Sequence, residues 1–271
     1  MKISVFYDHM REAAQQNHIS IDEVMKKAVS FRIKGIEIED RALIEDRENI
    51  CNLLSNNHME ISCIYGFFDY SHNSDLKRGF NLIDLAAELS VKKIMVIPGF
   101  LSDKEWKHSM MRNHCVKQMI TSMNILSKYA SNHGVMMVLE DFDDKSAYYK
   151  DSEGLSFFLS NINGLKCAFD TGNFLYSEED SLEVLPKFLS NIGHVHCKDR
   201  TFERKEGETP KETIKGRPMY SSPVGSGCIK MKEIVEQILS SGYDDYFAIE
   251  HFGSLHQLED MEASAAWLSK F

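Results

Sequence analysis

Short apolar runs alternate with amphipathic segments from one end of the chain to the other. The apolar runs are rich in Ile, Val and Met and cover residues 3–6, 35–38, 61–65, 93–97, 135–139, 165–169, 192–197 and 246–249. Runs of this length and composition are typical of strands that are buried on both faces of a parallel sheet. The pattern therefore predicts eight strands.

Helical periodicity fills the intervals between these runs. Apolar residues at 21, 24, 25, 28 and 29 lie on one helix face, and Ser20 with Glu23 has the sequence pattern of a capping box. The same period recurs within residues 116–123, 231–239 and 258–268. Strands that alternate with helices in this way are typical of parallel βα units.

Eight βα units in a chain of 271 residues predict an α/β fold. More specifically, they predict a single (β/α)8 TIM barrel that forms one domain over residues 1–271. A doubly wound open sheet is the alternative, and it would be expected to carry a glycine-rich phosphate loop after an early strand. No GxGxxG or GxxxxGK[ST] motif is present, which favours the barrel.

One connection is much longer than the others. Residues 199–227 follow the seventh predicted strand, are polar and charged, and show no helical period. A long loop inside a compact barrel is usually functional or disordered. We expect it at the catalytic face, where it could act as a lid; a mobile insertion without function is the alternative.

Composition and charge exclude several classes of protein. The chain has 31 Lys+Arg against 41 Asp+Glu, a net charge of −10, which disfavours general affinity for nucleic acid. No run approaches the ~18 apolar residues of a membrane helix, and residues 1–6 resemble a strand rather than a signal peptide. The six cysteines form no CxxC pair, which argues against a zinc finger or a disulfide framework. We expect a soluble, cytoplasmic protein with no membrane or nucleic-acid partner.

Four ligand-type side chains stand at the ends of consecutive predicted strands. They are Glu140, Asp170, His196 and Glu250. Because strand ends converge at the mouth of a barrel, three carboxylates would repel one another there. Protonation of one carboxylate or a nearby cation such as Lys198 could relieve this repulsion, but a divalent metal ion would do so best. Oxygen-rich ligation with one imidazole suits Mn²⁺, Mg²⁺ or Co²⁺, and Zn²⁺ also accepts it.

Each of these residues alone has an ordinary structural explanation. A glutamate at a strand end is often a helix cap or an ion-pair partner, and a single histidine can belong to the core. Four such residues at the same level of four strands favour a metal site.

The surrounding motifs resemble a known family. They are Val-Leu-Glu at 138–140, Phe-Asp-Thr-Gly-Asn at 169–173, His-Val-His-Cys-Lys-Asp at 194–199, Val-Gly-Ser-Gly at 224–227 and Ala-Ile-Glu at 248–250. In order and spacing they resemble the motifs of the xylose isomerase-like TIM-barrel superfamily. Within it, they resemble the sugar phosphate isomerase/epimerase group, which includes the D-tagatose 3-epimerase type.

The resemblance implies a metal-dependent isomerase or epimerase of sugars or sugar phosphates, acting through an enediolate. Glu140, Asp170, His196 and Glu250 would hold one divalent ion, with Mn²⁺ preferred. Glu140 and Glu250 would also serve as the acid/base pair, and the substrate would be a small carbohydrate. Homodimers and homotetramers are common in the family.

Further residues are assigned with the help of the resemblance. Asp199 completes the HxKD pattern and is expected to orient His196 or Lys198. Asn173 stands where many members have a substrate-contacting histidine, and Asp141-Phe142 replaces the more usual Asn-His pair.

Aromatic and basic side chains complete the expected binding site. Aromatic residues at strand ends could form an apolar wall for a sugar ring, although aromatics in a barrel are often core residues; Phe67 is one candidate. Basic residues near the long loop, Arg200, Arg204, Lys205 and Arg217, could hold an acid group or simply be solvated. The expected substrate-binding set is Asn173, Lys198, Tyr7, Tyr65, Trp106 and Arg217.

Three other functions are compatible with parts of the pattern. A dehydratase (a lyase) of keto-inositol or dehydroshikimate type also begins by removing a proton next to a carbonyl. The AP endonuclease branch would require more histidine ligands and a basic face, which the net charge of −10 disfavours. A non-catalytic binding protein on the same scaffold is the third alternative.

Overall fold

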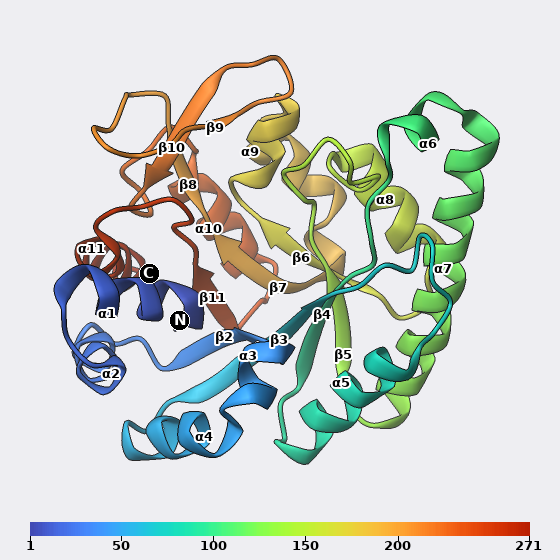
Figure 1. Ribbon diagram of the computed structural model, residues 1–271. Helices are drawn as coiled ribbons and strands as arrows, with labels where there is room; N and C mark the ends of the chain where they lie inside the picture. Colours follow the sequence, from blue (N-terminus) through green and yellow to red (C-terminus); the bar gives the residue numbers. More distant parts are fainter.

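Eight parallel strands close into a barrel in the computed structural model, which describes residues 1–271 (Figure 1). The order around the barrel is β1-β11-β7-β6-β5-β4-β3-β2. The strands are β1 (Lys2–Phe6), β2 (Gly35–Glu39), β3 (Glu60–Phe67), β4 (Lys93–Ile97), β5 (Met136–Leu139), β6 (Lys166–Asp170), β7 (Ile192–Cys197) and β11 (Tyr246–Ile249). The predicted fold class and all eight predicted strands are confirmed.

Helices connect the strands and cover the outside of the barrel. The longer ones are α1 (Tyr7–Asn17), α2 (Ile21–Ser30), α4 (Arg47–Asn56), α5 (Lys77–Glu88), α7 (Ser109–Asn132), α8 (Ser152–Asn161), α10 (Met231–Ser240) and α11 (Gln257–Leu268). Short helices are α3 (Asp40–Glu45), α6 (Asp103–Lys107) and α9 (Ser181–Val184), with 3₁₀ turns at Asn173–Ser177, Leu185–Lys187 and Leu189–Asn191. The predicted capping box is present, since Ser20 Oγ accepts from the backbone N–H of Glu23 and the Glu23 carboxylate accepts from that of Ser20.

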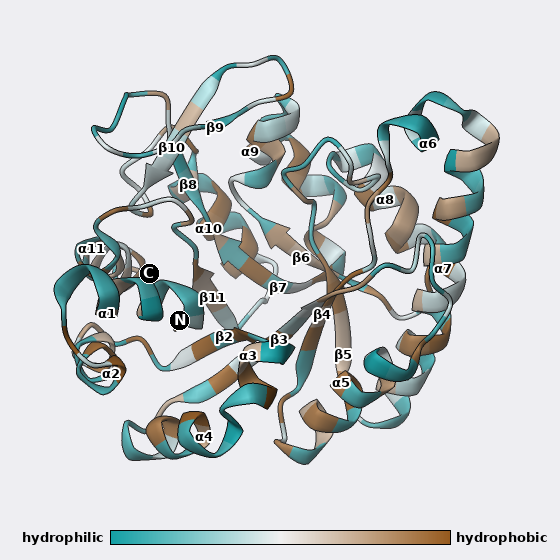
Figure 2. Cartoon of the chain, in the orientation of Figure 1, coloured by the Kyte–Doolittle hydropathy of each residue, from teal (hydrophilic) through white to brown (hydrophobic).

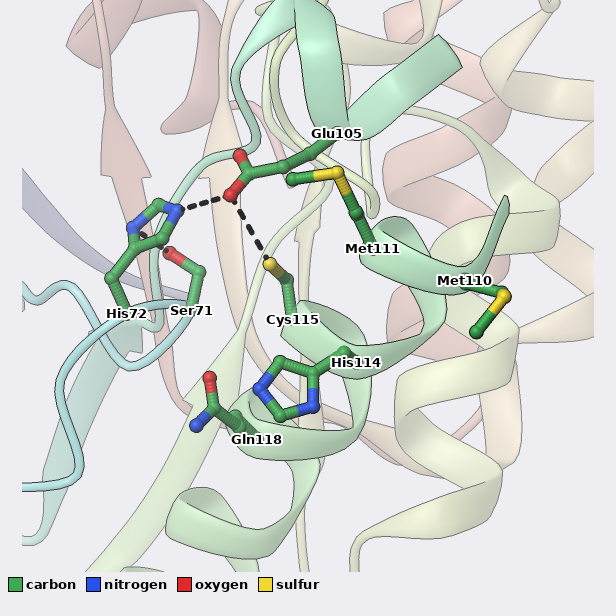
Figure 3. A pocket seen from close by; sticks show the side chains of 8 residues that line it. All are labelled: Ser71, His72, Glu105, Met110, Met111, His114, Cys115 and Gln118. Atoms are coloured by element: carbon green, nitrogen blue, oxygen red, sulfur yellow. Dashed lines mark hydrogen bonds and ion pairs between the residues drawn. The ribbon is translucent and has the colours of Figure 1, made fainter. Parts of the chain in front are cut away.

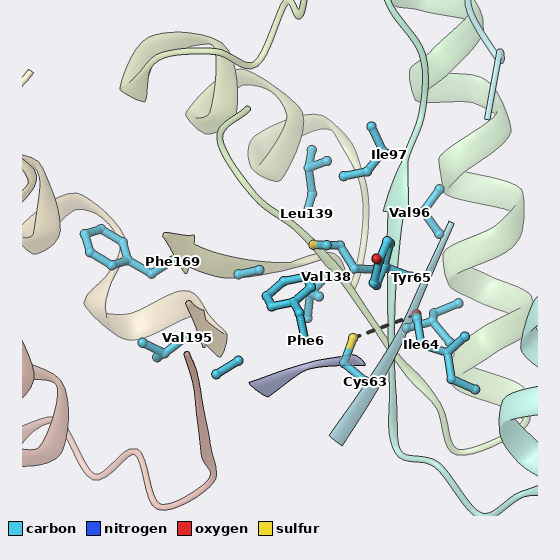
Figure 4. Close-up of a cluster of buried hydrophobic side chains, with 14 of the residues drawn as sticks. Phe6, Cys63, Ile64, Tyr65, Val96, Ile97, Val138, Leu139, Phe169 and Val195 are labelled. Atoms are coloured by element: carbon cyan, nitrogen blue, oxygen red, sulfur yellow. Dashed lines mark hydrogen bonds between the residues drawn. The ribbon is translucent and has the colours of Figure 1, made fainter. Parts of the chain in front are cut away.

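The hydrophobic core lies within the barrel and between the barrel and its helices. Figure 2 shows hydrophobic colours concentrated on strands such as β4, β5 and β11, whereas α1 and α6 are largely hydrophilic. Val5, Ile64 and Val138 have no exposed surface, and Figure 4 shows Leu139 and Phe6 within one of these clusters. Each fully buried aliphatic side chain contributes about 1.5–3 kcal/mol to folding, so this core can support a costly polar site.

The long connection after β7 contains a small antiparallel sheet. Its strands are β8 (Asp199–Thr201), β9 (Lys211–Glu212) and β10 (Pro218–Ser222), in the order β8-β10-β9. In Figure 1 this orange segment lies beside α9. The sequence predicts a connection without regular structure, and the structure differs because Thr201 pairs with Tyr220 and Lys211 with Met219 across the segment.

The first and last strands of the barrel are neighbours. Lys2 pairs with Tyr246 and Val5 with Ile249, so β1 and β11 close the ring. No helix of the structure combines the length and the apolar character that crossing a bilayer requires.

Candidate metal centre at the barrel mouth

The barrel brings the four strand-end side chains together. Asp170 is the last residue of β6 and lies in register with His196 on β7, while Glu140 and Glu250 directly follow β5 and β11. One nitrogen and three carboxylate oxygens from these residues all lie within 4.8 Å of one another. All four residues are buried. Parallel strands produce this convergence because their carboxyl ends point to the same edge.

His196 is the centre of the cluster. Its Nδ1 lies 2.9 Å from Glu140 Oε2, 3.5 Å from Glu250 Oε2 and 3.8 Å from Asp170 Oδ2. The ring of Phe6 packs edge-on against the imidazole, with 5.1 Å between the centroids. The imidazole therefore presents one nitrogen to three carboxylates and is held in that orientation by an apolar neighbour.

Burial and charge shift the pKa values of the cluster in different directions. Burial raises the pKa of Glu140, and it raises that of Glu250 to about 8 despite the neighbouring Lys198 ammonium. The pKa of Asp170 is lowered, because Lys198 and His196 outweigh the effect of burial. The pKa of His196 rises well above its usual value, since the surrounding carboxylates outweigh its own burial. The protonation states of these side chains are therefore strongly interdependent.

The donor set fits a divalent metal ion. Asp170 Oδ2 and Glu250 Oε2 are buried without a hydrogen-bond partner, although each faces His196 Nδ1. Unpaired buried carboxylate oxygens are costly, and a cation bound at bond lengths of about 2.0–2.2 Å would satisfy both. Three carboxylates and one imidazole form a four-ligand set for such an ion.

Lys198 and Asn173 lie beside the cluster. Lys198 Nζ is 2.5 Å from Glu250 Oε1 and 3.6 Å from Asp170 Oδ2, and it donates to Asn173 Oδ1 at 2.7 Å. The carboxylates raise the pKa of Lys198, so its ammonium stays charged. Asn173 donates in turn to the carbonyl oxygen of Asp141 at 2.7 Å, which fixes its amide orientation.

A buried polar column below His196 was missed by the sequence analysis. Glu37 on β2 lies 3.2 Å from His196 Nε2 and 2.8 Å from His194 Nε2. Burial and the Lys93 ammonium lower the pKa of His194 to about 4, so neutral His194 accepts from Lys93 Nζ and donates to Glu37. The sequence contains a sign of these contacts. Glu37 interrupts an apolar strand, and His194 lies two residues before His196, so both histidines point to the same face of β7.

A cavity of about 560 Å³ opens above the cluster. Aromatic side chains line it together with basic and acidic side chains, several of which come from the β7–α10 segment. The lining residues are Phe6, Asp8, Glu39, Tyr65, Phe67, Met95, Glu140, Phe142, Asp143, Asn173, Lys198, Arg200, Thr209, Pro210, Lys211, Glu250, Phe252 and Gly253. The volume is typical of small-molecule sites.

The structure places only part of the expected substrate-binding set at this cavity. Tyr65, Asn173 and Lys198 line it, and so does Phe67. Tyr65 donates to Asp8 at 2.8 Å, which fixes its ring.

Tyr7, Trp106 and Arg217 lie elsewhere. The chain passes from β1 into α1 at Tyr7, so Phe6 faces the cavity and Tyr7 packs into the core. Trp106 lies on α6 outside the barrel, where it stacks on Tyr148. The Arg217 guanidinium carbon lies 3.3 Å from the ring centroid of Phe202. The expectation that these three side chains line the binding site is therefore corrected.

Asp199 also has a different set of contacts from the one expected. Its carboxylate accepts from the backbone N–H groups of Arg200, Gly225, Gly227 and Ile229, at 2.8–3.2 Å. It therefore fixes the end of the long connection and makes no hydrogen bond to His196 or Lys198. A Cβ at position 227 would lie 2.3 Å from Asp199 Oδ1, which explains the glycine there.

Comparison with known proteins identifies the family. The barrel and its cluster define a TIM barrel with a candidate metal centre, and the family model described as xylose isomerase-like TIM barrel matches residues 25–271. The chain belongs to this family.

Similar curated proteins include inosose dehydratases. The chain is 34% identical over 87 residues to an inosose dehydratase of Geobacillus thermodenitrificans, covering 30% of this chain and 28% of that protein. It is 25% identical over 155 residues to an inosose dehydratase of Clostridium perfringens, covering 55% and 48%. The matched regions thus span about half or less of these relatives' length.

Solved structures share the fold over the whole chain. A probable 3-DHS dehydratase from Bacillus anthracis has a TM-score of 0.74 at 17% identity, covering 99% of both chains. The IOLI protein with a bound zinc atom has a TM-score of 0.75 at 13% identity, covering 100% of this chain and 97% of that one. A D-tagatose 3-epimerase-like protein has a TM-score of 0.71 at 17% identity, covering 100% and 98%.

The expectation of an isomerase is wrong. The curated relatives are named dehydratases, and removal of water is a lyase reaction. Isomerases, epimerases and dehydratases can all begin by removing a proton next to a carbonyl, so the ligand motifs alone do not separate them.

Proposed function

We propose that this protein is a metal-dependent dehydratase that removes water from a cyclic polyhydroxy ketone of keto-inositol or dehydroshikimate type. One observation carries the proposal: the buried Glu140, Asp170, His196 and Glu250 cluster lies at the floor of the cavity, with Lys198 in contact with Glu250. The names of the curated relatives favour dehydration over isomerisation.

The four clustered side chains would hold the metal ion. The ion would supply Lewis-acid polarisation of the substrate carbonyl, which acidifies the neighbouring C–H bond. Three oxygen donors and one nitrogen favour Mn²⁺, with Mg²⁺, Co²⁺ and Zn²⁺ as alternatives that reconstitution of the metal-free protein with each ion would rank.

Dehydration requires a base and an acid. A proton leaves the carbon next to the ketone, a hydroxyl leaves the next carbon, and together they form one water molecule. Glu140 and Glu250 both face the cavity and are the candidate bases. Lys198 is the nearest proton donor for the leaving hydroxyl. The 2.5 Å contact between Lys198 and Glu250 allows the abstracted proton to return to the amine.

Arg200 distinguishes two kinds of substrate. It lines the cavity, and its Nε is buried without a hydrogen-bond partner although its terminal nitrogen bonds Asp143 at 3.2 Å. A substrate carboxylate would pair with this group, whereas a neutral ring would not. We expect Arg200→Met to lower turnover of 3-dehydroshikimate at least tenfold and to leave that of a keto-inositol nearly unchanged.

The test is a reaction in deuterated water. Metal-loaded protein is incubated with 2-keto-myo-inositol or 3-dehydroshikimate, and NMR follows both loss of water and exchange of the proton next to the ketone. We expect elimination from at least one ketone, and its loss on chelation. Lys198→Met should keep the exchange but lower elimination by ~100-fold, because the acid and not the base is removed.

Lys211→Met is the matched control, since Lys211 also lines the cavity but bonds Asp143 instead of the cluster. Elimination should change little in this variant. Metal-loaded protein that eliminates water from neither ketone would contradict the proposal, as would equal loss of elimination in both lysine variants.

A further inference from the structure

A second group of ligand-type side chains lies outside the barrel. It consists of His72 in the loop after β3, Glu105 on α6 and Cys115 on α7. One nitrogen, one oxygen and one sulfur atom of these residues lie within 4.8 Å of one another. Figure 3 shows the three side chains converging from separate elements. None of them belongs to the cluster at the barrel mouth.

The two closest pairs in this group share one oxygen. Glu105 Oε1 is 2.7 Å from His72 Nε2 and accepts from Cys115 Sγ at 3.4 Å. Tetrahedral zinc, with bonds of about 2.0–2.3 Å, places neighbouring ligand atoms about 3.3–3.7 Å apart. The sulfur–oxygen pair already has this spacing, and the nitrogen–oxygen pair needs to open by about half an ångström.

Neighbouring groups orient each of these ligand atoms. Asp69 Oδ1 lies 2.6 Å from His72 Nδ1, so Nε2 is left to face Glu105. A histidine that binds metal is usually held in this way, with its other nitrogen bonded to a carboxylate. The second carboxylate oxygen of Glu105 accepts from the backbone N–H and hydroxyl of Ser102, at 2.6 and 2.7 Å, which directs Oε1 toward the other two ligands.

A pocket of about 580 Å³ opens onto the group. Glu105 and Cys115 are buried, whereas the His72 side chain is 44% exposed and faces this opening. His114, Gln118 and Met111 also line the pocket (Figure 3). An ion held by three side chains would therefore keep a fourth position open to water or to a further ligand.

We propose that His72, Glu105 and Cys115 form a Zn²⁺ site that is separate from the barrel mouth. The combination of imidazole, carboxylate and thiolate is a set that zinc binds, and its sulfur donor distinguishes it from the oxygen-rich mouth. Zinc binding at this site does not depend on the proposed dehydratase reaction at the barrel mouth, so either proposal can fail without the other.

The test uses cobalt as a spectroscopic substitute for zinc in the full-length chain. A thiolate ligand gives an intense near-ultraviolet charge-transfer band with Co²⁺, which carboxylate and imidazole ligands do not give. We expect the wild-type chain to show this band, and to bind a second Co²⁺ ion without a thiolate band where the barrel mouth is also occupied. Cys115→Ser should remove the band and one ion, and Glu250→Gln should keep the band.

Cys228→Ser is the matched control, because Cys228 is an exposed free cysteine remote from the group. This variant should leave the charge-transfer band and the number of Co²⁺ ions bound per chain unchanged. His72→Asn, at a partly exposed position, should weaken zinc binding at least tenfold without unfolding the protein, which circular dichroism checks. An absent band, a band that survives in Cys115→Ser, or unchanged zinc affinity in folded His72→Asn would overturn the proposal.

Discussion

At the barrel mouth, β6 and β7 carry Asp170 and His196, and Glu140 and Glu250 follow β5 and β11, whereas β1, β3 and β4 contribute Phe6, Tyr65, Phe67 and Met95 to the cavity wall. The first group, the charged half, consists of three buried carboxylates that repel one another, with His196 between them and the Lys198 ammonium beside them. The second group, the apolar half, forms a continuous wall. Phe6 contacts Tyr65 at 5.6 Å between centroids, and Tyr65 contacts Phe67 at 6.1 Å.

The two halves have opposite effects on folding. Burial of carboxylates costs several kcal/mol per charge unless each is paired, whereas burial of aromatic rings stabilises the fold. The barrel tolerates the charged half because the free-energy cost of burying its carboxylates is confined to four strand ends. The apolar side chains along the strands still pack in the core. This separation also divides the expected chemistry, with proton transfer on one side and ring binding on the other.

Glu37 connects the two halves through a side-chain contact. It lies on β2, among the strands of the apolar half, but it contacts His196 of the charged half. Burial of Glu37 would raise its pKa, but His196 and His194 outweigh this and lower it, so the carboxylate is charged. It therefore fixes which nitrogen of His196 faces the other carboxylates.

The largest expected effect comes from removing a charge in the charged half. Glu250→Gln should lower elimination activity by ~10³-fold and abolish tight metal binding at the barrel mouth, because it removes both a ligand and a candidate base. The melting temperature of the chelated protein should change little, since the loss of one repelling carboxylate is offset by the loss of its ion pair with Lys198. Glu39→Gln, at the cavity but outside the cluster, is the control and should change activity less than about threefold. Retention of the metal ion at the barrel mouth in Glu250→Gln would show that Glu250 is not one of its ligands.

A smaller effect is expected at the boundary. Glu37→Gln keeps the shape of the side chain but weakens its hold on His196, so metal affinity should fall about 10–100-fold. Competition with a fluorescent chelator measures this change. Unchanged affinity would show that the Phe6 contact alone orients the imidazole.

Substitution in the apolar half should affect binding rather than turnover. Phe67→Ala should raise KM about 3–10-fold and leave kcat nearly unchanged, because the wall touches the ring and not the reacting atoms. Phe67 is 37% exposed, so little stability should be lost. Phe157→Ala, a comparably exposed position on α8, is the control and should change neither constant. A fall in kcat alone would contradict the division between the halves.

The smallest effect is expected at an aromatic residue outside both halves. Trp106→Phe should leave kcat and KM within about twofold, because Trp106 contacts Tyr148 and Lys150 and does not line the cavity. Steady-state kinetics with the wild-type substrate measures this. A tenfold rise in KM would indicate that Trp106 does contribute to substrate binding.

The strands and the four clustered side chains could be predicted because both follow from local pattern and one topological rule. Buried strands give apolar runs, and a closed parallel barrel brings the residues after those runs to one end. Asp170 and His196 needed no further information. The small sheet within residues 199–227 could not be predicted, since its short polar strands pair across the segment without apolar alternation.

The substrate side of the site was harder to predict. Tyr7, Trp106 and Arg217 lie on helices or in the long connection, where distant packing partners such as Tyr148 and Phe202 set the direction of the side chain. Residue type alone does not reveal those partners. The reaction type was also not determined by the ligand motifs, because the shared first step precedes the point where dehydration and isomerisation diverge.

The pairing of β1 with β11 sets an order of events during synthesis. At about 5–20 residues per second, the ribosome completes β1 long before β11, so one edge of β1 stays unpaired until nearly the whole chain has emerged. Glu250 follows β11 directly and is thus the last of the four clustered side chains to arrive. A nascent chain can assemble three of them but not the fourth. Metal capture at the mouth is therefore expected only after ring closure, so the amount of metal bound at the mouth would report the fraction of closed barrels.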